Sequence, residues 1–168
     1  AVKQVYPNAE IWVVVRGGCE GIIAGCQHID QLRTAMIAEH GAERKVHRGA
    51  DVRLLRELRA ARFEHAFELG GGERGRWLVA LSGARGRTTT TSAMVFPPRW
   101  KIAFNRPATR KRYGFHEVQR DYMTVGEVLP LPGEIPPLRF APEAMQPWAP
   151  GDLPGDFAVI HAGTRWPK

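Results

Sequence analysis

Proline divides this 168-residue chain into two parts that fold under different constraints. Nine of the thirteen prolines lie between Pro130 and Pro167. Proline has no backbone N–H to donate and its φ angle is fixed, so a segment this rich in proline builds neither a long helix nor a central strand. We therefore predict a single domain at residues 1–128 and an extended Pro-rich arm at residues 129–168. The arm is expected to pack on the domain, on a second copy of the chain or on an assembly partner.

The first 73 residues have the pattern of a hairpin followed by two helices. The β-branched run at 11–15 predicts a strand, with 21–25 as its hairpin partner. Apolar residues at helical spacing predict helices at about 29–40 and 51–69. Asp51 is a suitable N-cap for the second helix. Residues 70–72, three glycines, are interpreted as its stop and linker, not as a phosphate-binding loop.

The second half of the domain has the pattern of an antiparallel sheet. Short apolar or β-branched runs separated by turn residues predict strands at 77–81, 88–96, 100–104 and 113–118, with a fifth at 126–131. In the third of these runs, Trp100, Ile102 and Phe104 alternate with Arg99, Lys101 and Ala103, which predicts a basic outer face over an aromatic core. The expected fold class is α+β.

Charge is segregated along the chain, whose net charge is +7. Residues 1–73 have ten basic and ten acidic side chains, residues 74–120 have eleven basic and one acidic, and residues 121–168 have three basic and six acidic. The middle segment alone therefore has a balance of +10. Such segregation indicates the kind of partner that a chain binds more than the fold that it adopts.

The basic segment favours nucleic acid as the partner. Lys and Arg neutralise phosphates, and interleaved aromatic side chains can stack on unpaired bases. We predict a domain that grips the phosphate backbone of DNA or RNA with a basic sheet and a hairpin at 106–112. The alternatives are another polyanion, an acidic protein surface, or an ordinary solvated face. The predicted contact residues are Arg85, Arg87, Arg99, Lys101, Arg106, Arg110, Lys111 and Arg112.

Other classes of site have less support in the sequence. Cys19, Cys26, His28 and His40 include zinc-type ligands, but their spacing is not that of a zinc site, so no metal or cofactor is predicted. No apolar run has the ~20 residues of a membrane span. No signal-peptide pattern is visible at Ala1, and two cysteines build no disulfide framework. We expect a cytoplasmic protein.

Residues 11–40 resemble the start of a GIY-YIG nuclease. Ile11-Trp12-Val13 and Ile23-Ala24-Gly25 stand where that family has its two tripeptides, and Arg33 stands where it has a catalytic arginine on the first helix. The resemblance implies that Arg33 polarises a phosphate and that a later acid, Glu68 or Glu73, binds a divalent metal. The alternative interpretation is a hairpin and a helix with an exposed arginine.

A second set of residues resembles the ADP-ribosyltransferases of the arginine–serine–glutamate type. Arg16 ends a predicted strand, Ser92 closes a Thr-Thr-Ser run, and Glu127 opens a segment similar to the glutamate strand of that family. The resemblance implies NAD as cosubstrate, with Arg16, Ser92 and Glu127 as site residues. Nucleic-acid binding is the favoured hypothesis, and the sequence leaves open whether any catalysis follows.

Overall fold

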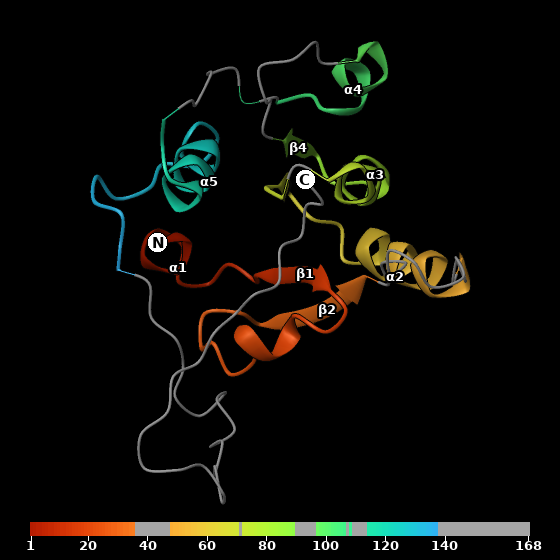
Figure 1. Cartoon of the computed structure of the whole chain (residues 1–168), viewed down its shortest axis with the longest axis horizontal. Coiled ribbons are helices and arrows are strands. Elements are labelled where there is room, and N and C mark those ends of the chain that lie inside the picture. The colour runs from red at the N-terminus through yellow and green to blue at the C-terminus, as the bar shows by residue number, and fades with distance from the viewer. Residues whose placement is uncertain (36–47, 71, 90–96, 107, 109–113, 138–168) are drawn as a thin grey trace, which may run out of the picture.

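The computed structural model describes residues 1–35, 48–70, 72–89, 97–106, 108 and 114–137. This part has a mixed α/β fold with five helices, a short 3-10 helix and two parallel two-stranded sheets (Figure 1). The elements in chain order are α1 (Val2–Val5), β1 (Trp12–Arg16), the 3-10 helix η1 (Glu20–Ile22), β2 (Gln31–Ala35), α2 (Arg48–Ala60), β3 (His65–Glu68), α3 (Glu73–Leu81), β4 (Gly86–Thr89), α4 (Pro98–Ala103) and α5 (Glu117–Gly126).

The N-terminal sheet pairs β1 with β2 in parallel, from Trp12 opposite Gln31 to Arg16 opposite Ala35. The predicted hairpin at 11–15 and 21–25 is therefore wrong, as is the helix at 29–40 over its described part. The helical spacing of the apolar residues there is overridden by the ladder with β1, because tertiary pairing outweighs local propensity. Asp30 fixes the start of β2, since its carboxylate accepts a hydrogen bond of 2.7 Å from the backbone N–H of Ile11 and pairs with Lys3.

The predicted second helix is confirmed as α2, which packs its apolar side on β2. Leu54 and Leu58 are buried with Ala35 in one cluster of the core, against which Trp12, Val14, Phe63 and Leu78 pack. The helix ends at Ala60, nine residues earlier than expected. Arg62 has a φ of 52°, a left-handed conformation that turns the chain away from the helix and toward β3.

A β-α-β unit follows, in which α3 connects two parallel strands. His65 to Glu68 of β3 pair with Gly86 to Thr89 of β4. Residues 77–81, predicted as a strand, belong to helix α3. The prediction failed because a run of five apolar residues has no period that distinguishes a strand from a helix. The strand at 88–96 is present in its described residues, Thr88 and Thr89. The other edge of β4 is paired too, since Arg106 and Ala108 donate backbone hydrogen bonds to the carbonyls of Arg87 and Thr89.

The last two helices replace the remaining predicted strands. Residues 100–103 belong to α4, which begins with Pro98 at its first turn, a favoured position for proline. Residues 117–126 form α5, whose start is fixed by His116 and Gln119 in a reciprocal capping box. No strand is found in the described residues of 113–118 or in 126–131. Both described sheets pair their strands in parallel, so the expected antiparallel sheet is wrong.

The segment after α5 begins against that helix. The hydroxyl of Tyr122 donates hydrogen bonds to the carbonyls of Pro132 and Glu134, the latter at 3.1 Å. Residues 138–168, most of the predicted Pro-rich arm, lie outside the described residues. Figure 1 shows β1 and β2 in the lower part of the described fold, with α2 beside α3 and with β4 and α4 above them.

Candidate functional site

Backbone hydrogen bonds bring three segments together at the amino ends of β3 and β4. Arg85 donates its backbone N–H to the carbonyl of Phe63 at 3.2 Å, and Gly86 donates to Glu64 at 2.8 Å. The side-chain amide of Asn105 donates to the carbonyl of Arg85 at 2.6 Å. The end of α2, the loop before β4 and the segment after α4 therefore meet at one place.

Four exposed arginines lie on these three segments, and we call them the basic cluster: Arg59, Arg62, Arg85 and Arg106. Arg59 extends from the last turn of α2 over Gly83, where an added Cβ would lie 3.8 Å from its Cγ. Arg62 directly precedes Phe63, and Arg106 directly follows Asn105. Among the described residues, none of the four has an acidic partner. Within the described ranges, the cluster therefore presents positive charge that no carboxylate neutralises.

The sequence predicts only half of this cluster. Arg85 and Arg106 belong to the basic segment, whereas Arg59 and Arg62 lie at or just after the end of α2, within residues 1–73, where basic and acidic side chains balance. Their place at its C-terminal end was the available signal. That position also has a purely structural benefit, since a positive side chain near a helix C-terminus interacts favourably with the helix dipole.

Arg87 is held differently from its neighbour Arg85. Its guanidinium donates from Nε to the carbonyl of Ala103 at 2.6 Å and from Nη1 to the carbonyl of Ala84 at 2.7 Å. The side chain is half-buried and ties the end of α4 to the loop before β4. Its two carbonyl contacts leave it less free to contact a phosphate than the four arginines of the basic cluster.

The predicted residues on α4 are divided between surface and core. Arg99 pairs with Glu73 at 2.7 Å and stacks over Trp100, while Lys101 is exposed and has no acidic partner among the described residues. Trp100 and Phe104 are buried as expected, but Ile102 is 83% exposed because the segment is a helix. Arg110, Lys111 and Arg112 lie outside the described residues.

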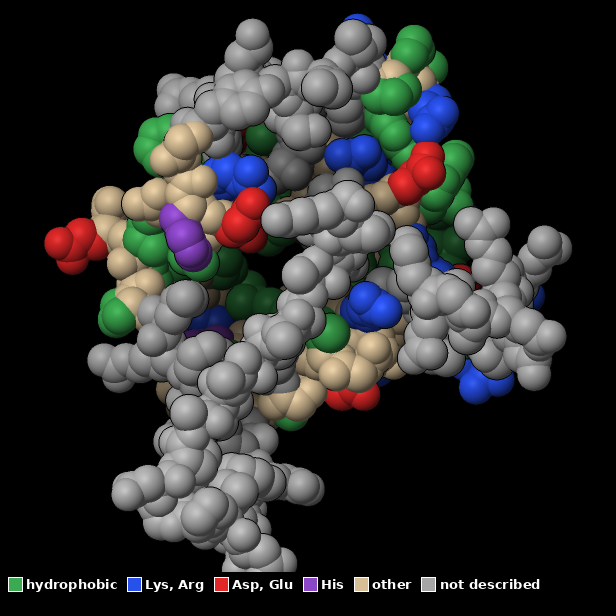
Figure 2. Space-filling view, viewed as in Figure 1, with side chains coloured by type: hydrophobic (Ala, Val, Ile, Leu, Met, Phe, Trp, Pro, Cys, Tyr) green, Lys and Arg blue, Asp and Glu red, His purple; other side chains and the backbone are tan. Residues whose placement is uncertain are grey.

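The surface in the view of Figure 1 has mixed charge. Figure 2 shows Lys and Arg side chains at several separate places on this face, with Asp and Glu between them, while hydrophobic side chains gather at the upper right over α4. Folding also pairs Arg99 of the basic segment with Glu73, which lies outside that segment.

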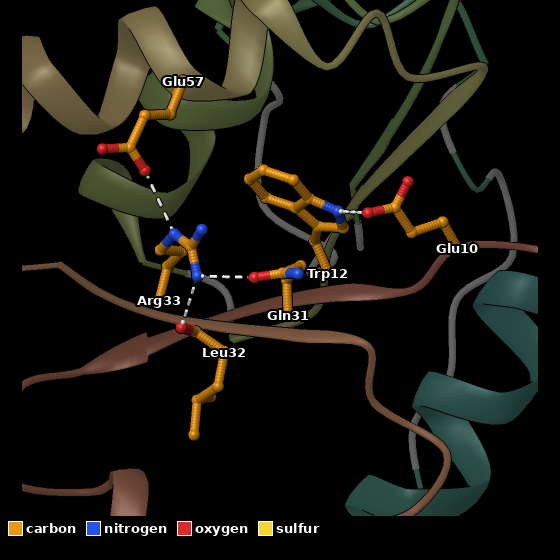
Figure 3. A network of polar contacts seen from close by, with 6 residues as sticks. All are labelled: Glu10, Trp12, Gln31, Leu32, Arg33 and Glu57. Carbon is orange, nitrogen blue, oxygen red and sulfur yellow. Dashed lines mark hydrogen bonds and ion pairs between the residues drawn. The ribbon is translucent and has the colours of Figure 1, made fainter.

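Arg33, the candidate nuclease arginine, lies on β2 and not on a helix (Figure 3). Its Nε pairs with Glu57 of α2 at 3.0 Å, and its Nη1 donates to Gln31 and to the carbonyl of Leu32. Its guanidinium also lies 4.9 Å from the ring centroid of Trp12. These contacts connect β2 to α2. Of the two acids expected as its partner, Glu73 pairs with Arg99 and Glu68 lies beside Arg76.

The candidate transferase residues are not brought together in the described structure. Arg16 is exposed at the end of β1, and Glu127 is the C-terminal cap residue of α5, where a glutamate strand was expected. Ser92 lies outside the described residues. The segment that carries the resemblance at Glu127 is a helix end followed by turns.

A buried carboxylate lies at the carboxyl ends of β3 and β4. Glu68, 5% exposed, accepts hydrogen bonds from the backbone N–H of Gly72 at 3.1 Å and from the hydroxyl of Thr89 at 2.8 Å. The Nε of Arg76 lies 3.8 Å from the same carboxylate. We call these residues the Glu68 centre.

The Glu68 centre corrects the interpretation of the glycines at 70–72. They follow a strand and precede α3, which is the arrangement of phosphate-binding loops. The carboxylate of Glu68, however, already binds the N–H group of Gly72, the N-cap of α3, where an anionic ligand would bind. The N–H group of Gly72 is therefore already engaged by Glu68.

Asp121 of α5 belongs to the surroundings of the Glu68 centre. Burial raises the pKa of its carboxyl, the Arg120 guanidinium lowers it, and the Glu68 carboxylate raises it further. Its Oδ1 is buried without a hydrogen-bond partner among the described residues. Two carboxyl groups thus share one polar region with Arg76.

The cysteines and histidines do not converge in the described part of the chain. Cys19 is exposed and Cys26 half-buried, both as free thiols. No group of three metal-ligating side chains occurs among the described residues, and His40 lies outside them.

No family model, curated protein or solved structure matches this chain. Any functional inference therefore depends on the residues and their geometry. Within the described ranges, no helix is long and apolar enough to cross a membrane.

Proposed function

We propose that this chain binds DNA or RNA by the phosphate backbone, with the basic cluster as the main contact surface and the exposed Lys101 as a further contact. The observation that carries the proposal is the convergence of Arg59 and Arg62 from α2 with Arg85 and Arg106 from later segments. A guanidinium presents a planar fork of donors that matches a phosphate, and arginines without acidic partners are free to use it.

The proposal does not need the basic sheet that the sequence suggested. Phosphate contacts require exposed cations on a rigid support, and the backbone hydrogen bonds at Phe63, Glu64 and Arg85 supply that support. Phosphate contacts position a nucleic acid without specifying its sequence. We therefore expect similar affinities for oligonucleotides of different sequence.

Salt titration tests the proposal. For duplex DNA, log K falls against log salt with a slope of about 0.9 per neutralised phosphate. The Arg85→Ala/Arg106→Ala variant should flatten this slope by about one to two units, measured by fluorescence anisotropy of a labelled oligonucleotide.

The matched control is Arg16→Ala/Arg53→Ala, which removes the same charge from exposed arginines outside the basic cluster. It should change the slope by less than half as much. Equal changes in the two variants would mean that net charge and not the basic cluster governs binding. No binding at low salt would end the proposal.

A further inference from the structure

An apolar groove lies between α2 and α3, away from the Glu68 centre. It has a volume of about 160 Å³ and walls of hydrocarbon. Three of its residues are unusually exposed for their type: Val52 at 48%, Trp77 at 47% and Leu81 at 44%. Exposed apolar residues that line one concavity indicate a binding surface more than scattered ones do. The groove is lined by Val52, Leu55, Trp77, Leu78 and Leu81, together with the charged side chains of Asp51 and Arg74.

The two helices that form the groove run side by side in the same direction. Asp51 and Arg74 pair at the amino ends of α2 and α3, and Arg59 lies over Gly83 just past the other end. From Arg74 to Leu81 the groove extends for about 10 Å at 1.5 Å per residue, roughly two helical turns. A third helix laid along it would bury an apolar stripe of that length.

The two ends of the groove differ in charge. At the amino end, Asp51 pairs with Arg74 and Glu73 pairs with Arg99, so the charges are balanced. At the carboxyl end, Arg56 and Arg59 follow Val52 and Leu55 by one turn of α2, and they have no acidic partner among the described residues. The groove therefore favours an occupant with negative charge toward one end.

We propose that this groove docks the apolar face of an acidic amphipathic helix from a partner protein. The groove surface is mostly apolar, with the ring of Trp77 in one wall and the paired Asp51 and Arg74 at one end, so it suits Leu or Ile side chains, as in other helix-in-groove complexes. A second copy of this chain brings a net charge of +7 to a cationic end, so charge complementarity favours a different partner. The apolar lining of the groove is separate from the basic cluster, but Arg59 belongs both to that cluster and to the cationic end of the groove.

The test uses the full chain and a labelled model peptide of about 14 residues, four helical turns, with Leu on one face and Glu on the other. Val52→Glu should weaken its binding at least tenfold in fluorescence anisotropy. The control Ile102→Glu places the same charge on a side chain that is 83% exposed on α4, and it should leave the affinity unchanged. A second peptide with Lys in place of Glu should bind at least tenfold more weakly.

Circular dichroism first establishes that both variants keep the wild-type melting temperature. Equal affinity of the wild type and Val52→Glu for the acidic peptide, or no binding by the wild type, would overturn the proposal. Self-association that Val52→Glu abolishes in sedimentation would assign the groove to a second copy instead. Loss of oligonucleotide binding in Val52→Glu, with peptide binding intact, would assign it to bases.

Discussion

Arg85 and Arg87 lie two residues apart at the start of β4, and their side chains meet different surroundings. Arg85 is exposed, and only its backbone is held, by Phe63 and Asn105. Arg87 directs its guanidinium to the carbonyls of Ala103 and Ala84. The same residue type therefore serves two purposes: one arginine presents charge and the other supports the surface that presents it.

Substitution by alanine separates these two roles. Arg87→Ala leaves two carbonyls without their donors and should destabilise the fold by about 1–3 kcal/mol in urea denaturation. Arg85→Ala should change stability by no more than about 0.5 kcal/mol, since its side chain is exposed, but should weaken oligonucleotide binding. A variant pair with the opposite pattern would show that the basic cluster is misassigned.

At the scale of single residues, the sequence predicts charge better than its arrangement. The excess of Lys and Arg in residues 74–120 is enough to select Arg85 and Arg106. It cannot select Arg59 and Arg62, because they join the cluster through the contact of Arg59 with Gly83 and the hydrogen bond between Phe63 and Arg85. Those contacts depend on the fold and have no local pattern.

At the scale of elements, Glu68 connects three of them through one carboxylate. Glu68 is the last residue of β3. Its carboxylate accepts hydrogen bonds from the hydroxyl of Thr89, at the end of β4, and from the backbone N–H of Gly72, just before α3. Arg76, on the first turns of α3, supplies positive charge to the same group. The β-α-β unit is therefore held at its carboxyl end by a polar contact, in addition to its ladder.

Glu68→Gln should destabilise the protein by about 1–3 kcal/mol, because it removes the charge beside Arg76 and replaces an acceptor oxygen with an NH₂ group. Urea denaturation measures the change. Glu64→Gln is the matched control, since Glu64 lies one residue before the same strand but is exposed, and it should have little effect. A loss of stability that is equal in the two variants would mean that the Glu68 centre contributes nothing specific.

The elements themselves were predicted unevenly, for physical reasons. The apolar spacing with Asp51 near its start identifies that helix, but not the face that it buries: Leu54 and Leu58 are buried, whereas Val52 is 48% exposed. Trp77–Leu81 is apolar throughout, so no period distinguishes helix from strand. At 100–104 the alternating pattern was misleading, and the proline at the first turn of α4 was the better signal.

At the scale of the whole molecule, pH should reveal how α5 is placed against the β-α-β unit. Burial raises the pKa of Asp121 above its ordinary value of 3.8, so the folded protein holds this proton more tightly than the unfolded chain. The resulting stabilisation is complete below pH 3.8 and is lost as pH rises through the raised pKa. The asparagine in Asp121→Asn cannot ionise, so this variant does not lose stability as the pH rises. It should be more stable than the wild type at pH 7, and the difference in stability should shrink toward pH 3.8.

Asp30 provides a control of opposite sign. A hydrogen bond from Lys3 and another from the backbone of Ile11 lower the pKa of its carboxyl. Its stabilisation is present above the ordinary pKa and is lost as pH falls, so Asp30→Asn should be less stable than the wild type at pH 7. Urea midpoints across this pH range measure both variants. If the urea midpoints of Asp121→Asn and the wild type depended on pH in the same way, the burial of Asp121 near Glu68 would be contradicted.

The parallel pairing of both sheets sets an order of events during synthesis. Trp12 pairs with Gln31 and His65 with Gly86. The first strand of each pair therefore leaves the ribosome about twenty residues ahead of the second. At roughly 5–20 residues per second, β3 waits about one to four seconds before β4 exists. During that interval its edge is open to other chains. The nascent protein therefore acquires its sheets in two separate, delayed steps, each of which needs the intervening segment to be complete.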